Sequence, residues 1–556
     1  MNWELDRYKR QLGLVHQRRV MNLNILLLGE GPVLPYLAIN LALLGVGTGE
    51  GKIFLPQLSK RLGAPDLQGQ FFFRAEDEGL NISEAAAHRI HQMNSQVNVE
   101  LTSATDANFY DAVLIVSDTE SPRPSMTPVI WAGVTDYGLY VGAEKPQTRT
   151  LSPNLLTPSL ASLCGGLAAQ EMLRVTHCIR ATEIAKFWVT LNYTFREAMH
   201  DSHEPHKFSV DGVQTIAIMD DKDAGLPIDR IPMNLGNDLV QRLFEHTLID
   251  EPTDGIFSAP VPCFYYSPFW ENRLENGAVV EQLVELPVSL TDRIILGGVG
   301  GLGSWVAALL AVSRFAGNLV IFDNDTHIEN HNLNRQVLYG SHTLGLAKAP
   351  AAAHALTLLN PALTVINLTE EIEATTVVTR AALMHDADLA ISTFDNFRAR
   401  YVFAEWAALN HVPLINGGSD GFAGDVEVVV PEQSGCLFCW WERARGSAAA
   451  QAMSTHEEHL SCTREDANAP DVGRALVTTT AVIASMQTLL SLLTLCQPAA
   501  RTDHYLGYLG KENALEKCRL SRHNGNAPCP THEQGACEHP QQFWQMIEET
   551  LLGGDQ

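Results

Sequence analysis

Two stretches of this chain share one alternation of apolar and polar positions. In the first, NILLLGEGPVLPYLAINLALLGVG runs from an apolar strand through a short glycine turn into an apolar helix, and GKIFL follows as a second strand. In the second, IILGGVGGLGSWVAALLAVSRFAGNLVIF repeats this order from Ile294 onwards. Short apolar runs bounded by turns indicate buried parallel strands, and the longer runs indicate buried helices. The pattern predicts an α/β fold with two Rossmann-like units in tandem.

The second unit carries residues expected for nucleotide chemistry. Its turn has the spacing G-x-G-x-x-G at Gly298, Gly300 and Gly303, and a helix is expected from about Ser304. Such a turn lets the backbone approach a phosphate, and the positive end of the helix favours the anion. The second strand of the unit ends at Asp323, which is the usual place of a ribose-binding acid.

Polar residues after this strand distinguish the unit from a dinucleotide-binding one. The segment NHNLNRQ contains Asn332 and Arg335, Lys348 follows, and a later strand in ADLAISTFDN leads to Asp395. Cations for phosphates, together with a carboxylate for Mg²⁺, are the components of nucleotidyl transfer from ATP. A nicotinamide enzyme has little use for them.

With these motifs in order, the region from Val284 to about Thr494 resembles the ThiF/MoeB/ubiquitin-activating (E1-like) adenylation enzymes. The resemblance also covers VPLINGGSDGFAGDVEVVVP and a C-x-x-C. It implies that Asp323 holds the ribose of ATP and that Asp395 binds Mg²⁺. One residue more than usual separates Asp323 from N-L-N-R-Q, so Asp325 is a second candidate for the ribose contact. The remaining ATP-binding residues that the resemblance implies are Gly298, Gly300, Gly301, Gly303, Asn332, Arg335, Gln336 and Lys348.

The first unit resembles an E1-like domain too, including its R-Y-x-R-Q entry, but it lacks the nucleotide features. Its turn contains Glu30, which repels an anion, and Pro32, which removes an N–H donor. We therefore expect residues 1–200 to be an inactive copy. In two-domain E1 enzymes an arginine of the entry crosses to the ATP of the other half, and here this implies Arg10, or Arg7 in its place. The alternative is that Arg10 caps or pairs within its own helix.

Composition limits the partners and the compartment. A formal net charge of −26 disfavours nucleic acid and anionic membranes as main partners. The start MNWELDRYKRQ has no apolar signal-peptide core. The late apolar run TTTAVIASMQTLLSLLTLC is threaded with Thr, Ser and Gln, so we expect a buried helix and no membrane span. Ten unevenly spaced cysteines do not resemble a secreted disulfide framework, and we expect a cytoplasmic protein.

Cys462 is the candidate nucleophile. It lies in HLSCTREDANAPDVG, where the resemblance places a crossover loop, and the autophagy E1 carries its thioester-forming cysteine in such a loop. The sequence C-T-R-E-D departs from the autophagy version, and the adjacent acids do not lower a thiol pKa. A mobile loop suits a thiol that must stay away during adenylation and then reach the acyl-adenylate. The alternative is a structural or idle cysteine.

Two spaced pairs of ligands suggest a structural zinc site. Cys436 and Cys439 form a C-x-x-C, while Cys529 and His532 have the same two-residue gap near the end of the chain. Two such pairs complete a tetrahedral Zn²⁺ site. Alternative fourth ligands are Cys518, Cys537 and His539.

These observations define one expected architecture and function. Residues 1–200 would form the inactive unit, 201–284 a linker or small subdomain, 285–500 the active unit, and 501–556 a zinc-associated tail. The resemblance implies ATP-dependent activation of the C-terminal carboxylate of a ubiquitin-like protein, then a thioester on Cys462 and transfer to an E2-like carrier, as a monomeric pseudo-dimer or a homodimer. The compact architecture of the chain resembles that of the E1 of bacterial ubiquitin-like (Bil-type) operons. The alternative function is a ThiF/MoeB-type adenylase for sulfur transfer or peptide modification, without a lasting thioester.

Overall fold

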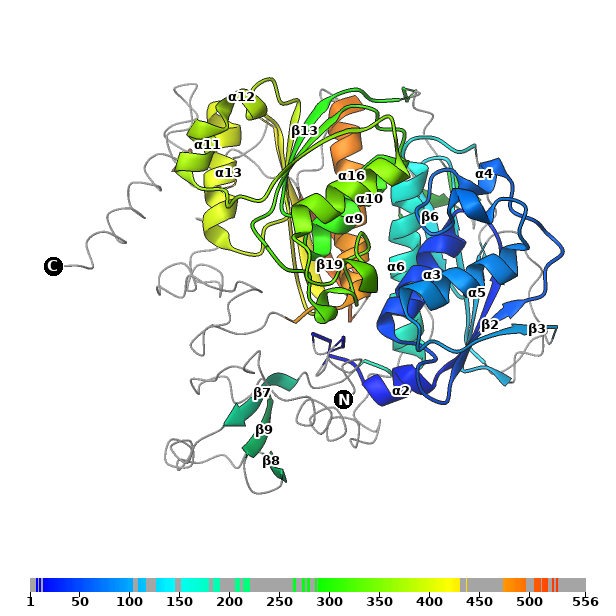
Figure 1. Ribbon diagram of the computed structural model, residues 1–556. Helices are drawn as coiled ribbons and strands as arrows, with labels where there is room; N and C mark the ends of the chain where they lie inside the picture. The colour runs from blue at the N-terminus through cyan, green and yellow to red at the C-terminus, as the bar shows by residue number, and fades with distance from the viewer. Residues whose placement is uncertain are drawn as a thin grey trace.

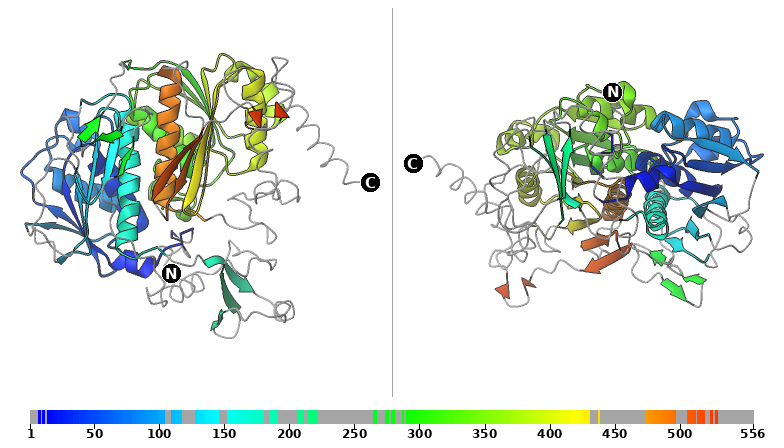
Figure 2. Two further views of the ribbon diagram at one scale, coloured as in Figure 1. Left: turned by 180° about the vertical axis from the view of Figure 1, so that it is seen from behind. Right: turned by 90° about the horizontal axis from the view of Figure 1, so that it is seen from below.

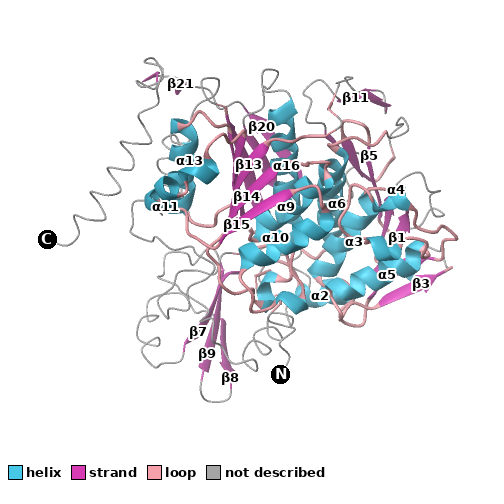
Figure 3. Ribbon diagram, turned by 45° about the horizontal axis from the view of Figure 1, so that its top comes forward, coloured by secondary structure: helices cyan, strands magenta, loops and turns pink. Residues whose placement is uncertain are grey.

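The computed structural model of the protein contains two large sheets joined by a shared helical layer (Figure 1). Three further small sheets are β7–β9–β8, β11–β12 and β21–β22. Figure 3 shows most of the helices lying between the two large sheets. The structure describes residues 7–8, 10–11, 14–103, 109–116, 127–145, 152–179, 184–190, 206–210, 214–220, 264–266, 273–275, 278–280, 286–287, 289–430, 437, 474–496, 505–511, 513–518, 523–524 and 527–528.

The first large sheet has seven strands in the order β10–β6–β5–β4–β1–β2–β3. Strands β1 to β5 pair in parallel, whereas β6 and β10 continue the sheet antiparallel. Apolar residues fill β1 and β4 because both lie in the middle of the sheet, covered on each face. The strands are β1 (Asn24–Gly29), β2 (Lys52–Pro56), β3 (Val99–Thr102), β4 (Ala112–Val116), β5 (Val129–Val134), β6 (Leu139–Gly142) and β10 (Phe264–Tyr266).

The second large sheet has eight strands in the order β15–β14–β13–β16–β17–β18–β19–β20. Its first five strands in this order are parallel, and the last three continue antiparallel. The strands are β13 (Arg293–Gly297), β14 (Asn318–Phe322), β15 (Thr364–Leu368), β16 (Leu389–Ser392), β17 (Leu414–Asp420), β18 (Ala423–Val429), β19 (Tyr505–Leu509) and β20 (Ala514–Cys518).

The α/β class with a mostly parallel sheet is confirmed, and the strand order of the first sheet recurs in the second. Two segments, however, cross the boundaries expected from the sequence. Strand β10 belongs to the expected linker 201–284 but pairs with β6. Strands β19 and β20 lie beyond residue 500 but extend the second sheet, because the alternating segment YLGYL pairs with β18.

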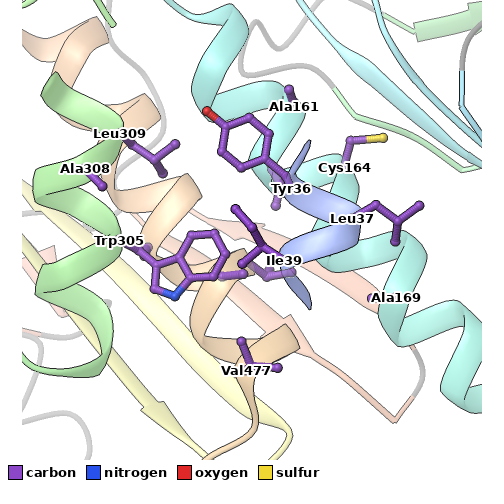
Figure 4. Packing of buried hydrophobic residues seen from close by; sticks show 14 of the residues in the cluster. Tyr36, Leu37, Ile39, Ala161, Cys164, Ala169, Trp305, Ala308, Leu309 and Val477 are labelled. Carbon is purple, nitrogen blue, oxygen red and sulfur yellow. The ribbon is translucent and has the colours of Figure 1, made fainter. Parts of the chain in front are cut away.

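Four helices form the layer between the large sheets. Helix α6 packs against α3 and α16, and α16 also packs against α9, so the four helices share one apolar core (Figure 4). Figure 4 shows Tyr36 of α3 and Trp305 of α9 in this layer, and Phe71 lies edge-on to both rings. The four helices are α3 (Val33–Leu44), α6 (Thr157–Val175), α9 (Gly301–Val312) and α16 (Val477–Cys496).

Helix α16 is the apolar run that the sequence predicted to be buried. It is long and apolar enough to span a membrane by composition, yet it is buried from Val477 to Thr494. Its polar side chains find partners inside the layer: Thr478 donates to Gln170 of α6 at 2.7 Å, and Ser485 to Ser162 at 2.8 Å. Figure 2 shows α16 beside α6 from behind. Polar contacts therefore supplement apolar packing between the two halves.

The turn of the β19–β20 hairpin is also held by α6. Gln170 donates to the carbonyl of Gly510 at 2.8 Å and Arg174 to that of Lys511 at 3.0 Å, while Asn513 donates to the carbonyl of Leu167 at 3.1 Å. All these contacts join residues more than 300 positions apart. The second sheet is thus fastened to the first half of the chain.

Of the other described helices, α5 and α10 extend this layer, because their buried residues belong to the same apolar core. Helices α5 and α10 follow α3 and α9 in the two halves, and α13 covers the opposite face of the second sheet. They are α2 (Gln17–Asn22), α4 (Ala64–Leu67), α5 (Ile82–Met93), α10 (Lys348–Leu359), α11 (Ala374–Thr379), α12 (Ala381–Met384) and α13 (Phe397–Leu409). The small-sheet strands are β7 (Ile184–Thr190), β8 (His206–Val210), β9 (Gln214–Asp220), β11 (Arg273–Glu275), β12 (Ala278–Val280), β21 (His523–Asn524) and β22 (Ala527–Pro528).

Candidate functional site

The glycine turn lies between β13 and α9 at the carboxyl edge of the second sheet. Gly298 has φ +86°, a conformation that favours glycine, and Gly300 precedes the first residue of α9. A Cβ on Gly303 would lie 2.1 Å from the carbonyl oxygen of Gly298, so the helix and the turn touch. A Cβ on Gly300 would meet nothing closer than the side-chain nitrogen of Gln336 at 4.0 Å. The turn therefore leaves space in front of the helix, where a phosphate is favoured.

Asp323 stands at the end of β14 and closes this turn. Its carboxylate accepts the backbone N–H of Val299 at 2.7 Å and that of Asp325 at 3.0 Å. Burial raises the pKa of Asp323 to about 6, and nearby Asp325 also raises it, while Lys348 and the two N–H donors oppose the shift. Asp323 thus orders the glycine turn and lies beside the candidate phosphate cation.

Lys348 begins α10 and is buried, and its ammonium pairs with the carboxylate of Asp325. Burial lowers the pKa of Lys348, but Asp325 and Asp323 outweigh it, so the pKa is raised and the side chain stays charged. Asp395 adds to the same field from the turn after β16. The two acids predicted as alternative ribose contacts and the lysine predicted to bind phosphate are thus neighbours in one charged group.

The segment 329–336, which contains N-L-N-R-Q, wraps the open end of the turn. We call it the strap. Asn332 accepts the N–H of Glu329 at 2.9 Å, which shapes the strap. Arg335 donates to the carbonyl of His331 at 2.7 Å and to Asn334 at 3.0 Å, and its carbonyl accepts from Trp305 of α9 at 2.9 Å.

Arg335 is directed at the glycine turn. A Cβ on Gly301 would lie 3.8 Å from its Nε, so the buried guanidinium borders the start of α9. Gln336 is buried as well, and its Oε1 has no hydrogen-bond partner among the described residues. Two strap residues that the sequence singled out, Arg335 and Gln336, therefore border the space in front of α9.

Asp395 is exposed in the turn after β16. The turn is fixed on both sides, because Asn396 caps α13 by accepting the N–H of Ala399 at 2.7 Å and Arg400 donates to the carbonyl of Phe394 at 2.7 Å. An exposed carboxylate on a fixed turn at the same sheet edge is a suitable ligand for Mg²⁺ carried in with ATP.

Both arginines of the R-Y-x-R-Q entry reach the strap. Arg10 is fully buried, with its Nη2 3.4 Å from His331 Nε2, and its carbonyl accepts the N–H of Ala475 at 2.9 Å. Arg7 donates instead to the main-chain carbonyls of Leu333 at 2.8 Å and Met93 at 2.6 Å. Arg10 therefore contacts the second half of the chain, whereas Arg7 ties the strap to α5.

The corresponding turn of the first half is arranged differently. Gly29 and Gly31 have φ of +96° and +112°, so this turn, like that of the second half, contains glycine with positive φ. Glu30 points to Lys60, whose ammonium lies 2.9 Å from it and 2.8 Å from Asp66. The cation at this turn is thus paired within the protein.

One acidic cluster was missed in the sequence. Glu427 of β18 is fully buried, accepts a hydrogen bond from Asn416 at 2.8 Å, and lies two residues from Asp425 on the same strand face. Burial raises the pKa of Glu427 to about 8, Asp425 adds to the shift, and Asn416 and Arg400 oppose it. The only sequence signal for this cluster is that acidic residues occur within the apolar strand segment DVEVVV.

Several predicted site residues lie outside the described residues. These are the nucleophile Cys462 and the zinc ligands Cys436, Cys439, Cys529 and His532, together with the alternatives Cys537 and His539. Cys518 is in β20. Among the residues that the structure describes, no group of three or more His, Cys, Asp or Glu could hold a metal ion. The thioester and the zinc site therefore stay predictions.

Comparison with known proteins gives matches for the second half of the chain. Residues 288–531 match the model of the ThiF family. The SAMP-activating enzyme E1 of Haloferax volcanii is 30% identical over 155 residues, which are 28% of this chain and 55% of that protein. The molybdopterin-synthase adenylyltransferase of Escherichia coli is 34% identical over 140 residues, 25% of this chain and 53% of that protein.

This chain thus spans about half the length of these curated relatives. A crystal structure of E. coli MccB with ATP aligns with 43% of this chain and 67% of its own, at 19% identity and a TM-score of 0.34. The resemblance to E1-like adenylyltransferases expected from the motifs is confirmed by the family model and the relatives.

Proposed function

We propose that this chain, whose residues 288–531 match the model of the ThiF family, activates the C-terminal carboxylate of a ubiquitin-like protein by adenylation. The observation that carries the proposal is one cluster around one glycine turn: Asp323, Arg335 and Lys348 with Asp395 beside them. The first half, with Lys60 paired to its own acids, would be the inactive partner.

In this reaction a carboxylate oxygen of the partner attacks the α-phosphorus of ATP. The bond between the α-phosphorus and the bridging oxygen breaks, and pyrophosphate leaves with the bonding electrons. Arg335, Lys348 and the N-terminus of α9 would stabilise the charge that grows on the phosphates, and Arg10 would add a cation from the other half. Asp395 would hold Mg²⁺, which supplies charge neutralisation on the triphosphate.

The finer steps concern residues outside the described part of the chain. The Cys462 thiolate would attack the acyl-adenylate, forming a thioester and releasing AMP, and the acyl group would pass to an E2-like carrier. Cys436, Cys439, Cys529 and His532 would bind a structural Zn²⁺ that fastens the end of the chain. The pairing of two halves in one chain would make a cytoplasmic monomer sufficient, although a homodimer of such chains is compatible with it.

The test uses the full chain with Mg-ATP and small candidate proteins that end in glycine. Candidate-dependent exchange of label between pyrophosphate and ATP, lost in Asp395→Ala, supports adenylation. An ATP-dependent adduct on a non-reducing gel that Cys462→Ala lacks supports the thioester. Exchange without any adduct would make the protein a sulfur-transfer or peptide-modifying adenylase, and relatives include the sulfur carrier protein ThiS adenylyltransferase of E. coli. Absence of exchange with every candidate would contradict the proposal.

A further inference from the structure

His331, the residue directly before N-L-N-R-Q, contacts both arginines of the candidate site. Its ring nitrogen Nε2 lies 3.4 Å from Nη2 of Arg10, and its main-chain carbonyl accepts a hydrogen bond from Nη1 of Arg335 at 2.7 Å. All three residues are buried. Arg10 comes from the entry segment of the first half and Arg335 from the strap of the second. One residue therefore joins the cations of two halves.

We propose that His331 is a positioning residue that holds Arg10 beside Arg335, so that both guanidinium groups face the triphosphate of ATP. This inference rests on the proposed adenylation and names how the cation of the first half is placed. The buried imidazole of His331, which has no part in the proposed phosphate chemistry, thereby has a role.

Chemistry explains why a histidine serves here. Two guanidinium groups repel each other and have only donors, so a residue between them must offer acceptors to both. A neutral imidazole with its proton on Nδ1 accepts at Nε2. The carboxylate of Glu329 lies 3.4 Å from this Nδ1, within ion-pair distance. The carbonyl of the same residue then accepts from Arg335.

The main chain holds Arg10 at the same place. The N–H of Ala475 binds the carbonyl of Arg10 at 2.9 Å, and the neighbouring Arg474 carbonyl accepts the N–H of Gly421 at 3.0 Å. The second half thus fixes the backbone of Arg10, and His331 directs its side chain. Two buried guanidinium groups at one residue suit the binding of a polyphosphate, which offers several anionic acceptors.

The experiment compares the full-length wild type with Arg10→Ala, His331→Leu and the double variant in ATP–pyrophosphate exchange. We expect His331→Leu and Arg10→Ala each to lower kcat about a hundredfold, and the double variant to be no worse than either, because they remove one interaction. KM for ATP should change much less. His331→Gln should recover most of the rate, because the glutamine oxygen can accept from Arg10.

Two controls separate this inference from a loss of folding or of the proposed function. His354→Leu on the exposed face of α10 should leave kcat unchanged. The free energies of unfolding in urea of the same four proteins form a second cycle that needs no turnover. Three results would overturn the inference. The kcat losses of Arg10→Ala and His331→Leu could multiply in the double variant, His331→Gln could fail to recover the rate, or the losses of unfolding free energy could add in the double variant. If the wild type shows no exchange, the proposed function fails, and the unfolding cycle alone decides whether His331 positions Arg10.

Discussion

Replacing Glu427 by glutamine should remove a pH dependence of stability that the second sheet carries. Glu427 is fully buried in β18, and burial with nearby Asp425 raises its pKa from the ordinary 4.5 to about 8. Its carboxyl therefore stays protonated in the folded protein at neutral pH. Glutamine keeps the oxygen that accepts from Asn416 and has no charge to acquire.

The direction and size of the effect follow from proton linkage. An acid whose pKa is higher in the folded than in the unfolded protein binds more protons when folded, so the stability it contributes is present below pH 4.5 and is lost as the pH rises through about 8. Between pH 6 and pH 9 the wild type should lose about 2–3 kcal/mol of unfolding free energy through this one group. The Glu427→Gln variant should not lose this part of the free energy of unfolding.

Urea unfolding of wild type and Glu427→Gln at pH 6 and pH 9 measures this difference directly. The variant should gain stability relative to wild type as the pH rises. Glu371→Gln, at an exposed position, is the matched control and should follow the wild type at both pH values. A difference between Glu427→Gln and wild type that stays constant from pH 6 to pH 9 would refute the assignment of a protonated buried carboxyl.

Three further substitutions test the glycine turn and the contact between the halves. Gly303→Ala would place a Cβ 2.1 Å from the Gly298 carbonyl, so ATP binding by calorimetry should be lost, and retained affinity would count against the turn as the phosphate site. Asp323→Asn keeps one acceptor for two backbone N–H groups, and ATP affinity should fall about tenfold; an unchanged affinity would mean that Asp323 does not order the site. Gln170→Ala leaves the buried Gly510 carbonyl without its donor, and the free energy of unfolding in urea should fall by about 1–3 kcal/mol; an unchanged urea midpoint would show that this contact adds nothing.

The placement of Asp323 and Asp395 at one sheet edge could be predicted from the sequence because each lies just beyond an apolar strand. Asp323 directly follows β14 and Asp395 lies three residues beyond the end of β16, and parallel strands bring their carboxyl ends to one edge. The spacing of Gly298 and Gly303 likewise encodes the close approach of turn and helix. Local order along the chain was sufficient for these residues.

The contacts between distant segments could not be predicted in the same way. No periodicity places Arg10 against His331, more than 300 residues later, because this depends on how two halves pack. The alternation of side chains along β18 places Glu427 on one face of the second sheet. The sequence does not show that α13 covers this face. The β19–β20 hairpin lies in the stretch 501–556 that the sequence predicts as a tail, because a segment as short as YLGYL does not show which sheet it joins.

Counting the ATP molecules that bind per chain in the presence of Mg²⁺ tests whether the second half alone forms a nucleotide site. Equilibrium dialysis should give one ATP per wild-type chain, none for Lys348→Ala, and one for Glu30→Gln in the corresponding turn of the first half. Two ATP molecules per wild-type chain, or undiminished binding by Lys348→Ala, would contradict the account.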